Sequence, residues 1–553
     1  MRFCFFFYNR QLPRKLKLLV TVAATCAAVT AVAAPNDLTN VPDANPKEPG
    51  FAAPNILSPE LTESIAAQGS MSLENGSLLT NFYGYDNDGP MLPAPGDVQT
   101  PTHNVEATKT EPDKNTYLIL PGLHGPDPQY DYGTHFLYQG HENGLKDAAG
   151  AGTGYITRVN LDADGAHRVT LLATADKNDT HLPTFDGSTW YPWAQRLLFT
   201  AELGNKGGVW QATPDFPSTV EDISGALGRG GYEGIQADAD GNLIIVEDTG
   251  GTNGLVHTHA KQPNSFVYRF VPKDRRDLTR GGKLQALQVM SLRHSGPIVF
   301  HAGAADADIL SQDTKDLHTY GNSFQTNWVT IHNTDVDGTT PFDANALAKA
   351  KQATPFKRPE NGQFRPGSHF TEFFFDETGD TNALTEAGSD FGGFGAIQKL
   401  TQATPFANTG TLTLFYKGDV EHTGLDNVGF WTKDQVVFVE DAGDTLHTQR
   451  NALDSAYLFD VNANYATPGL QPVRILAEGR DASATLDSGL GSVSGSGFQN
   501  DGDNEITGFH VSDGDPTLNG LLGAKNPNPF KAGWRVFYTQ QHGDNVTWEI
   551  TTK

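Results

Sequence analysis

The sequence predicts an all-β fold, a β-propeller of six blades with seven as the alternative. From residue 116 onward, short apolar runs such as TYLILPG, GYITRVNL, NLIIVED and TLTLFY alternate with turn residues, and helical periodicity is scarce. The 59 glycines and 32 prolines match such frequent interruption of short strands. Radial repetition is one way for a long all-β chain to avoid exposed sheet edges, so residues 116–553 are predicted to form the propeller.

Two segments far apart in the chain are copies of one structural unit. Glu233 precedes Glu247 by fourteen residues, and Asp426 precedes Glu440 by the same fourteen. Each copy ends in a pair of acids after an apolar run, as IIVEDTGG and VFVEDAGD. Repetition of this kind indicates a repeat architecture. Strands aligned on the glycine that follows the acids carry a carboxylate at one shared position, occupied by Glu142, Glu202, Asp248, Glu377 and Asp441.

These repeated acids predict a metal centre. Equivalent positions of successive blades face one another at one mouth of the central channel. Carboxylates at that range repel, so they need bound cations or protons to coexist. Oxygen ligands suit hard cations, above all calcium, and also ferric iron or manganese. His141, next to the first of these acids, could extend the ligand set. The predicted ligands are Glu142, Glu202, Glu233, Glu247, Asp248, Asp426, Glu440 and Asp441.

Turn capping is the other interpretation of the same acids. An aspartate at the end of a strand can accept hydrogen bonds from the backbone of the following tight turn, and the nearby glycines support that role. Capping explains one acid of each doublet. It leaves the second acid, together with Glu233 and Asp426, for the metal interpretation to explain.

The N-terminal part of the chain is predicted to lie outside the propeller. Residues 1–34 have the pattern of an export signal, basic residues followed by an apolar run, with a single membrane anchor as the alternative. Residues 35–115, rich in Pro, Asn, Asp and Thr, are predicted to form an irregular extension. Both cysteines, Cys4 and Cys26, lie in the signal, so the mature chain is expected to have no disulfide and no thiolate ligand.

Charge and motifs exclude several classes of function. The chain has 39 basic and 65 acidic side chains, a net charge of −26, and such a field repels nucleic acid and anionic membrane surfaces. It suits cation binding, but acidic surfaces also keep exported proteins soluble. The sequence has no G-x-S-x-G elbow, P-loop, H-E-x-x-H motif or dinucleotide fingerprint at a strand-to-helix turn. We expect a monomer in the periplasm or secreted, without membrane contact after signal removal.

Four motifs carry a resemblance to a known family, and they stand in family order between about residue 115 and the end of the chain. The chain resembles the PhoX family of exported bacterial alkaline phosphatases in the segments GHEN (140–143), YPWAQRLLFTAELGN (191–205), GYEGIQADADGNLIIVED (231–248) and GLDNVGFWTKDQVVFVED (424–441).

The resemblance implies a six-bladed propeller whose axial carboxylates hold a cluster of iron and calcium ions. This cluster would hydrolyse a small substrate that is a phosphate monoester. On this basis Glu202 corresponds to the glutamate that closes the family's PWG…CEEN segment. Glu233 corresponds to the acid of its HEG motif and Asp426 to the acid of its RPE motif, while Glu247 or Asp248 matches the acids that end the next strand. The family's cysteine ligand to iron has no counterpart, because the matching segment reads LLFTAELG.

Three functions remain open from the sequence. The first is an exported metal-dependent phosphatase, with calcium and possible iron, in which Arg229 and Arg450 are the predicted phosphate contacts. The second is a non-catalytic calcium-binding propeller that serves as an interaction module of the cell envelope. The third is a calcium-dependent hydrolase of another ester class, since propellers also host lactonases and phytases. The missing cysteine favours the second, and the retained acids favour the first and third.

Overall fold

Antiparallel sheets of short strands build the described part of the chain. The computed structural model describes residues 38–47, 53–85, 109–142, 144–146, 152–480 and 505–553. The predicted signal, 1–34, lies outside these ranges. The first sheet has the order β3 (Thr116–Ile119), β4 (His135–Gly140), β7 (Ile156–Asn160) and β8 (Val169–Ala173). The second has the order β9 (Ser188–Tyr191), β10 (Arg196–Ala201), β11 (Gly208–Ala212) and β12 (Val220–Asp222).

A nine-stranded sheet follows, in which two four-stranded meanders are joined through the long strand β17 (Phe324–Asn333). The first meander is β13 (Tyr232–Ala237), β14 (Leu243–Glu247), β15 (Val267–Pro272) and β16 (Gly282–Val289). The second is β18 (Gly362–Phe364), β19 (Glu372–Glu377), β20 (Ala396–Gln402) and β21 (Thr409–Lys417). Strand β14 is buried along its length, which explains its unbroken apolar run.

Strands from the predicted N-terminal extension complete the last two large sheets. One sheet runs β22 (Leu425–Thr432), β23 (Gln435–Glu440), β24 (Ser455–Asp460), β25 (Val473–Ala477) and then β1 (Ile56–Leu57). The other runs β26 (Glu505–Ser512), β27 (Arg535–Gln541), β28 (Val546–Thr552) and then β2 (Leu61–Ala67). A two-stranded sheet pairs β5 (Leu145–Lys146) with β6 (Gly152–Thr153). The described parts of residues 35–115 therefore contribute to the sheets.

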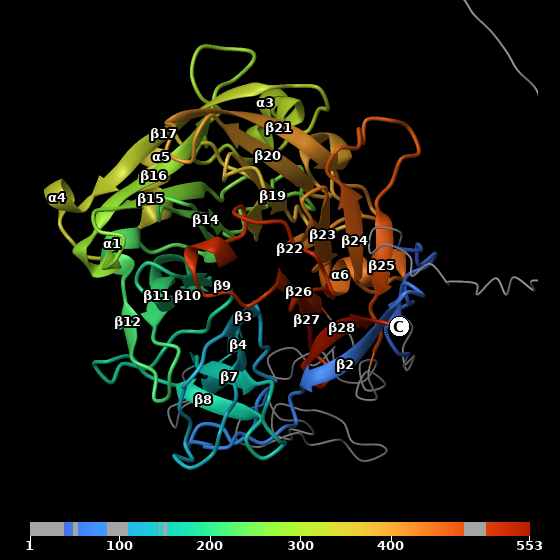
Figure 1. Cartoon of the computed structure of the whole chain (residues 1–553). Helices are drawn as coiled ribbons and strands as arrows, with labels where there is room; N and C mark the ends of the chain where they lie inside the picture. The colour runs from blue at the N-terminus through green and yellow to red at the C-terminus, as the bar shows by residue number, and fades with distance from the viewer. Residues whose placement is uncertain (1–37, 48–52, 86–108, 143, 147–151, 481–504) are drawn as a thin grey trace, which may run out of the picture. The chain divides into compact units, whose positions relative to one another are not determined.

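The first strand of each meander lies toward a common centre. Contacts run in a closed circle from β3 to β9, β13, β18, β22, β26 and back to β3. Figure 1 shows the sheets placed around this centre, with β3, β9, β22 and β26 closest to it. Apolar clusters fill the spaces between neighbouring sheets; one lies between β22–β25 and β26–β28, and another between the β3 and β9 sheets. The arrangement is mostly β and propeller-like, as the repeats predict.

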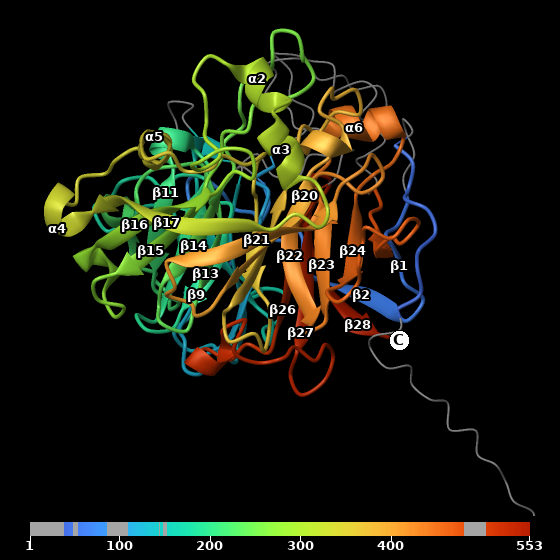
Figure 2. The same ribbon diagram turned by 90° about the horizontal axis from the view of Figure 1, so that it is seen from above.

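The α-helices in the described part of the chain are short. They are α1 (Ser224–Leu227), α2 (Ala305–Ile309), α3 (Gln312–Leu317), α4 (Thr334–Asp337), α5 (Ala344–Ala350) and α6 (Gly443–Arg450). Figure 2 shows α2, α3, α5 and α6 at the same end. No helix in the described part of the chain combines the length and the apolar character needed to cross a membrane.

We predict that the pairing of β2 with β28 makes a large contribution to the stability of the fold. Leu61 begins β2 opposite Thr552 and is 1% exposed in the apolar cluster between the last two sheets. Leu61→Ala should lower the free energy of unfolding by about 2–5 kcal/mol, because the residual cavity adds to the lost burial. Urea unfolding measures the change. Ile65→Ala on the same strand is the control, since Ile65 is 46% exposed. Equal losses for the two variants would contradict this role of β2.

Candidate metal centre

Carboxylates reach the axis from two kinds of position. One carboxylate lies at or just before the first strand of each four-stranded meander. Others lie just after the second strand of several meanders. The first kind comprises Asp113, Asp186, Glu233, Glu360, Asp426 and Glu505. The second kind comprises Glu142, Glu202, Asp248 and Asp441. Since both positions repeat from sheet to sheet, side chains that are distant in sequence meet at one end of the ring.

The first buried group consists of Glu233, Glu360 and Asp426, which offer oxygen atoms that all lie within 4.8 Å of one another. Neighbouring amides orient them: Asn361 Nδ2 donates to Glu233 Oε1 at 2.6 Å, and Asn427 Nδ2 donates to Asp426 Oδ1 at 2.7 Å. Among the described residues no N–H or hydroxyl group donates to Asp426 Oδ2. Burial raises the pKa of Asp426 to about 8, and the charges of nearby acids add to the effect.

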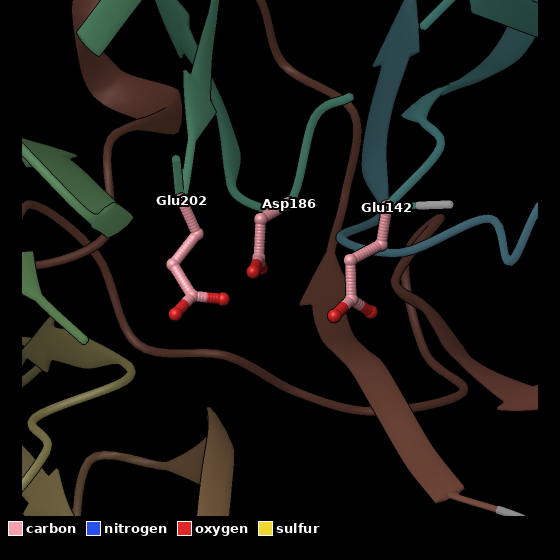
Figure 3. A group of neighbouring side chains, drawn as sticks. All are labelled: Glu142, Asp186 and Glu202. Atoms are coloured by element: carbon pink, nitrogen blue, oxygen red, sulfur yellow. The ribbon is translucent and has the colours of Figure 1, made fainter. Parts of the chain in front are cut away.

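The second group consists of Glu142, Asp186 and Glu202, whose oxygen atoms also lie within 4.8 Å of one another. Figure 3 shows their carboxylates directed into the same space from the end of β4, the segment before β9 and the end of β10. Gln541 Nε2 donates to Glu142 Oε2 at 3.0 Å. Burial raises the pKa of all three acids well above the ordinary range, and the neighbouring negative charges raise it further. Each group therefore favours either protons or a cation.

The donor sets fit a hard cation. Both groups offer carboxylate oxygen alone, without a histidine or cysteine among the described residues that compose them. Such oxygen-rich sites suit calcium, and the oxygen atom of Asp426 that receives no hydrogen bond is available as a ligand. Soft thiolate chemistry has no donor here.

Cationic side chains lie among these acids. Arg358 binds Asp248 through two groups, with Nε 3.0 Å from Oδ1 and Nη2 2.7 Å from Oδ2, and its Nη2 is also 2.9 Å from Glu360 Oε1. Its backbone φ is 58°, a left-handed conformation that residues other than glycine seldom adopt. Thr378 N donates to the Arg358 carbonyl at 2.9 Å and holds that conformation. Lys114 is buried beside the first group.

The structure separates the two members of each acid doublet. Adjacent residues on a strand point to opposite faces, so Glu247 and Asp248 cannot both face the axis. Glu247 instead accepts hydrogen bonds from Tyr268 Oη of its own sheet at 2.8 Å and from Asn345 Nδ2 of α5 at 3.0 Å. Glu440 binds Arg450 through both carboxylate oxygens, each at 3.0 Å. Glu247 and Glu440, both predicted as metal ligands, thus have hydrogen-bond partners within the protein.

The predicted phosphate contacts are engaged elsewhere. Arg229 donates to the Gly207 carbonyl at 2.9 Å and pairs with Asp222, and its guanidinium lies 5.2 Å from the centre of the Trp210 ring. Arg450, 4% exposed, is held by Glu440 as described. Their role in phosphate contact stays a prediction. His141 is buried and stacks on Tyr155 at 3.9 Å, which leaves it outside both carboxylate groups.

Sequence reasoning missed two members of the groups, Asp186 and Glu360. A signal for Glu360 stands in the sequence, because residues 358–360 themselves read RPE, the motif that the resemblance assigns to Asp426. Glu360 and Asp426 lie in the same group, so the motif and its assigned residue are spatial neighbours. Asp186, in the segment TFDG, has no repeated strand pattern before it and offers no comparable signal.

A family model of alkaline phosphatase PhoX matches residues 226–451, the region that contains the first carboxylate group and Arg358. Over this segment the chain resembles the PhoX family. Pseudomonas fluorescens PhoX, solved in complex with vanadate, a transition state analogue, has a TM-score of 0.53 with this chain at 13% identity. That match covers 93% of this chain and 98% of the other. This chain therefore has the fold of that protein.

Other solved structures are less similar to this chain. Virginiamycin B lyase from Staphylococcus aureus has 11% identity and a TM-score of 0.30, covering 79% of this chain and 99% of the other. The periplasmic gluconolactonase of Pseudomonas aeruginosa has 12% identity and a TM-score of 0.29, covering 89% and 96%. No curated protein matches the sequence.

The burial of Glu247 predicts a pH-dependent stability. Burial raises its pKa from 4.5 to about 7. The folded state therefore binds this proton more tightly than the unfolded state, and stability is lost as pH rises from about 4.5 through about 7. Relative to Glu247→Gln, the wild type should lose on the order of 3 kcal/mol between pH 4.5 and 8.

Urea unfolding of both proteins at pH 4.5 and pH 8 measures this difference, in which the other titrating groups cancel. Glu421→Gln, which removes an exposed carboxylate, is the control. A constant offset between the wild type and Glu247→Gln across this range would contradict the prediction.

Proposed function

We propose that the chain is an exported metal-dependent phosphatase that hydrolyses phosphate monoesters. The observation that carries this proposal is the buried group of Glu233, Glu360 and Asp426 beside Arg358, within the segment that matches the PhoX model. We further infer six blades, since the first strands β3, β9, β13, β18, β22 and β26 contact one another in a closed circle. We also propose that the protein acts as a monomer on a small substrate, in the periplasm or after secretion.

Calcium is the metal that these residues favour. The ligand groups offer oxygen alone, and a family whose iron has a cysteine ligand would find none in this chain after residue 34. When bound, a cation of this kind polarises phosphoryl oxygens and stabilises the charge that develops on them. Glu233, Glu360 and Asp426 would hold one ion, and Glu142, Asp186 and Glu202 another.

Arg358 is the residue that we propose to contact the phosphoryl group. Asp248 and Glu360 bind its Nε and Nη2 and fix the plane of the guanidinium. Arginine has five N–H donors, so those of Nη1 are left for oxygen atoms of a substrate. The guanidinium keeps its charge at alkaline pH, which suits binding of a phosphate dianion. Its side chain is 18% exposed, against 5% for Asp248 and 4% for Glu360, and so retains some access to solvent.

The activity test uses protein purified without chelator. We expect hydrolysis of p-nitrophenyl phosphate, loss of that activity with EGTA, and recovery when calcium is added back. p-Nitrophenyl acetate is the comparison substrate, and its preferred hydrolysis would favour an enzyme of another ester class. Absence of turnover with calcium and iron supplied, alongside retained calcium binding, would overturn the phosphatase proposal and support a calcium-binding module.

The ligand test compares two buried glutamates of one sheet. Glu233→Gln should reduce calcium content by about one ion per chain, because one charged ligand of the first group is lost. Glu247→Gln should leave the content unchanged, since Glu247 lies outside both carboxylate groups and its Oε2 accepts from Tyr268 and Asn345. Elemental analysis of folded protein, verified by circular dichroism, gives the counts. Equal losses in both variants would contradict the assignment of ligands.

A further inference from the structure

Lys114 is a buried cation in the middle of the carboxylates. Only 3% of its surface is exposed, and its Nζ donates to Asn427 Oδ1 at 2.7 Å. Asn427 in turn donates through Nδ2 to Asp426 Oδ1 at 2.7 Å. The lysine ammonium is therefore one amide away from a member of the first carboxylate group.

A closed set of hydrogen bonds holds this lysine in place. Asn427 Nδ2 also donates to Thr507 Oγ1 at 3.0 Å, and Thr507 Oγ1 donates to Asp113 Oδ1 at 2.6 Å. Asp113 is the residue before Lys114, so the path returns to its start. Ser188 Oγ donates to the Lys114 carbonyl at 3.0 Å and anchors the backbone. The ammonium is thus an ordered part of the site, not a flexible surface charge.

The surroundings of Lys114 resemble those of a cation site. The carboxylates that act most strongly on its charge are Asp426, Asp113, Glu233 and Asp376. Asp426 Oδ2 and Asp376 Oδ2 are buried and receive no hydrogen bond from the described residues. Carboxylate oxygens and an asparagine carbonyl are ligands that calcium uses. The oxygen of Asn427 that accepts the hydrogen bond from the ammonium is such a carbonyl.

We propose that the ammonium of Lys114 occupies a cation position within the carboxylate cluster, and that the centre consequently holds one calcium ion fewer than its acids alone would bind. A lysine ammonium is a compact point charge with three donors, so it can replace a cation among oxygen atoms. The inference rests on the proposed metal function, and it makes Lys114 a positioning residue for the cluster.

The test counts calcium ions in variants that remove or keep this charge. Lys114→Met and Lys114→Gln leave Asn427 Oδ1 and the surrounding acids without the ammonium, and each should gain about one calcium per chain. Lys114→Arg keeps the charge and should keep the wild-type count. Lys525→Met is the matched control for net charge, because Lys525 binds Asp513 and Asp515 outside the carboxylate groups; its count should stay at the wild-type value.

Elemental analysis and calorimetric titration of the folded proteins with calcium give the counts independently of activity. An unchanged or reduced count in a folded neutral variant overturns the inference, as does a gain in Lys114→Arg. Wild-type protein that binds no calcium overturns the proposed metal function itself, so the two failures are distinguishable. Loss of activity in Lys114→Met with an unchanged count would assign the lysine to substrate contact and would also overturn the inference.

Discussion

Mutual repulsion of carboxylates at the axis is the constraint on which the rest of the site depends. Two unit charges 4 Å apart interact by about 4 kcal/mol at an effective dielectric constant of 20, and the acids here face several such neighbours. In the described part of the chain the cations that act on them, Lys114, Lys261 and Arg358, are fewer than the acids. Protons compensate in part, because burial raises the pKa of Asp426 to about 8 and that of Glu233 well above its usual range. Cations that replace these protons would bind more tightly as pH rises.

The alternation of side chains along a strand explains why acids occur in pairs at the strand ends. One member of each doublet faces the axis and the other enters the sheet. Glu247 accepts from Asn345 of α5, and Glu440 binds Arg450 of α6. Glu247 and Glu440, the members that enter the sheet, therefore each bind a helix that lies at the end of the sheets (Figure 2). Repetition of the doublet reflects a repeated attachment of covering helices as well as a repeated contribution to the axis.

Local patterns predicted the parts of the fold that local patterns determine. Runs of alternating apolar residues and turns gave the strands, and the fourteen-residue spacing identified two equivalent sheets correctly. The alignment that placed Glu377 at the position of Asp248 was wrong by one residue. Thr378 N donates to the Arg358 carbonyl in the way that Asp248 N donates to the Gly231 carbonyl. Thr378 therefore occupies the shared position, and Glu377 corresponds to Glu247. The pairing of β2 with β28 had no local signal, since it joins segments at opposite ends of the chain.

The candidate site was predictable where an acid stood in a repeated strand and hidden where it stood before one. Glu233 and Asp426 were found and are brought together, whereas Asp186 and Glu360 precede the first residues of short inner strands. Lys114 lies in a segment whose composition indicated an irregular extension. Composition cannot identify such a residue, because its importance comes from neighbours more than three hundred positions away in the chain, as its bond to Asn427 illustrates.

The absence of a thiolate and the presence of fixed cations have the same effect on the charge of the cluster, because both make it less negative. A cysteine ligand would bring a negative charge and a soft donor to a cluster that already has excess negative charge. In this chain the corresponding segment has no cysteine, while Lys114 and Arg358 add positive charge from the protein itself. Both features reduce the positive charge that bound ions must supply. Under the proposed function, a centre of this composition would require fewer ions, all of them hard, and would retain Arg358 as a permanent cation for an anionic substrate.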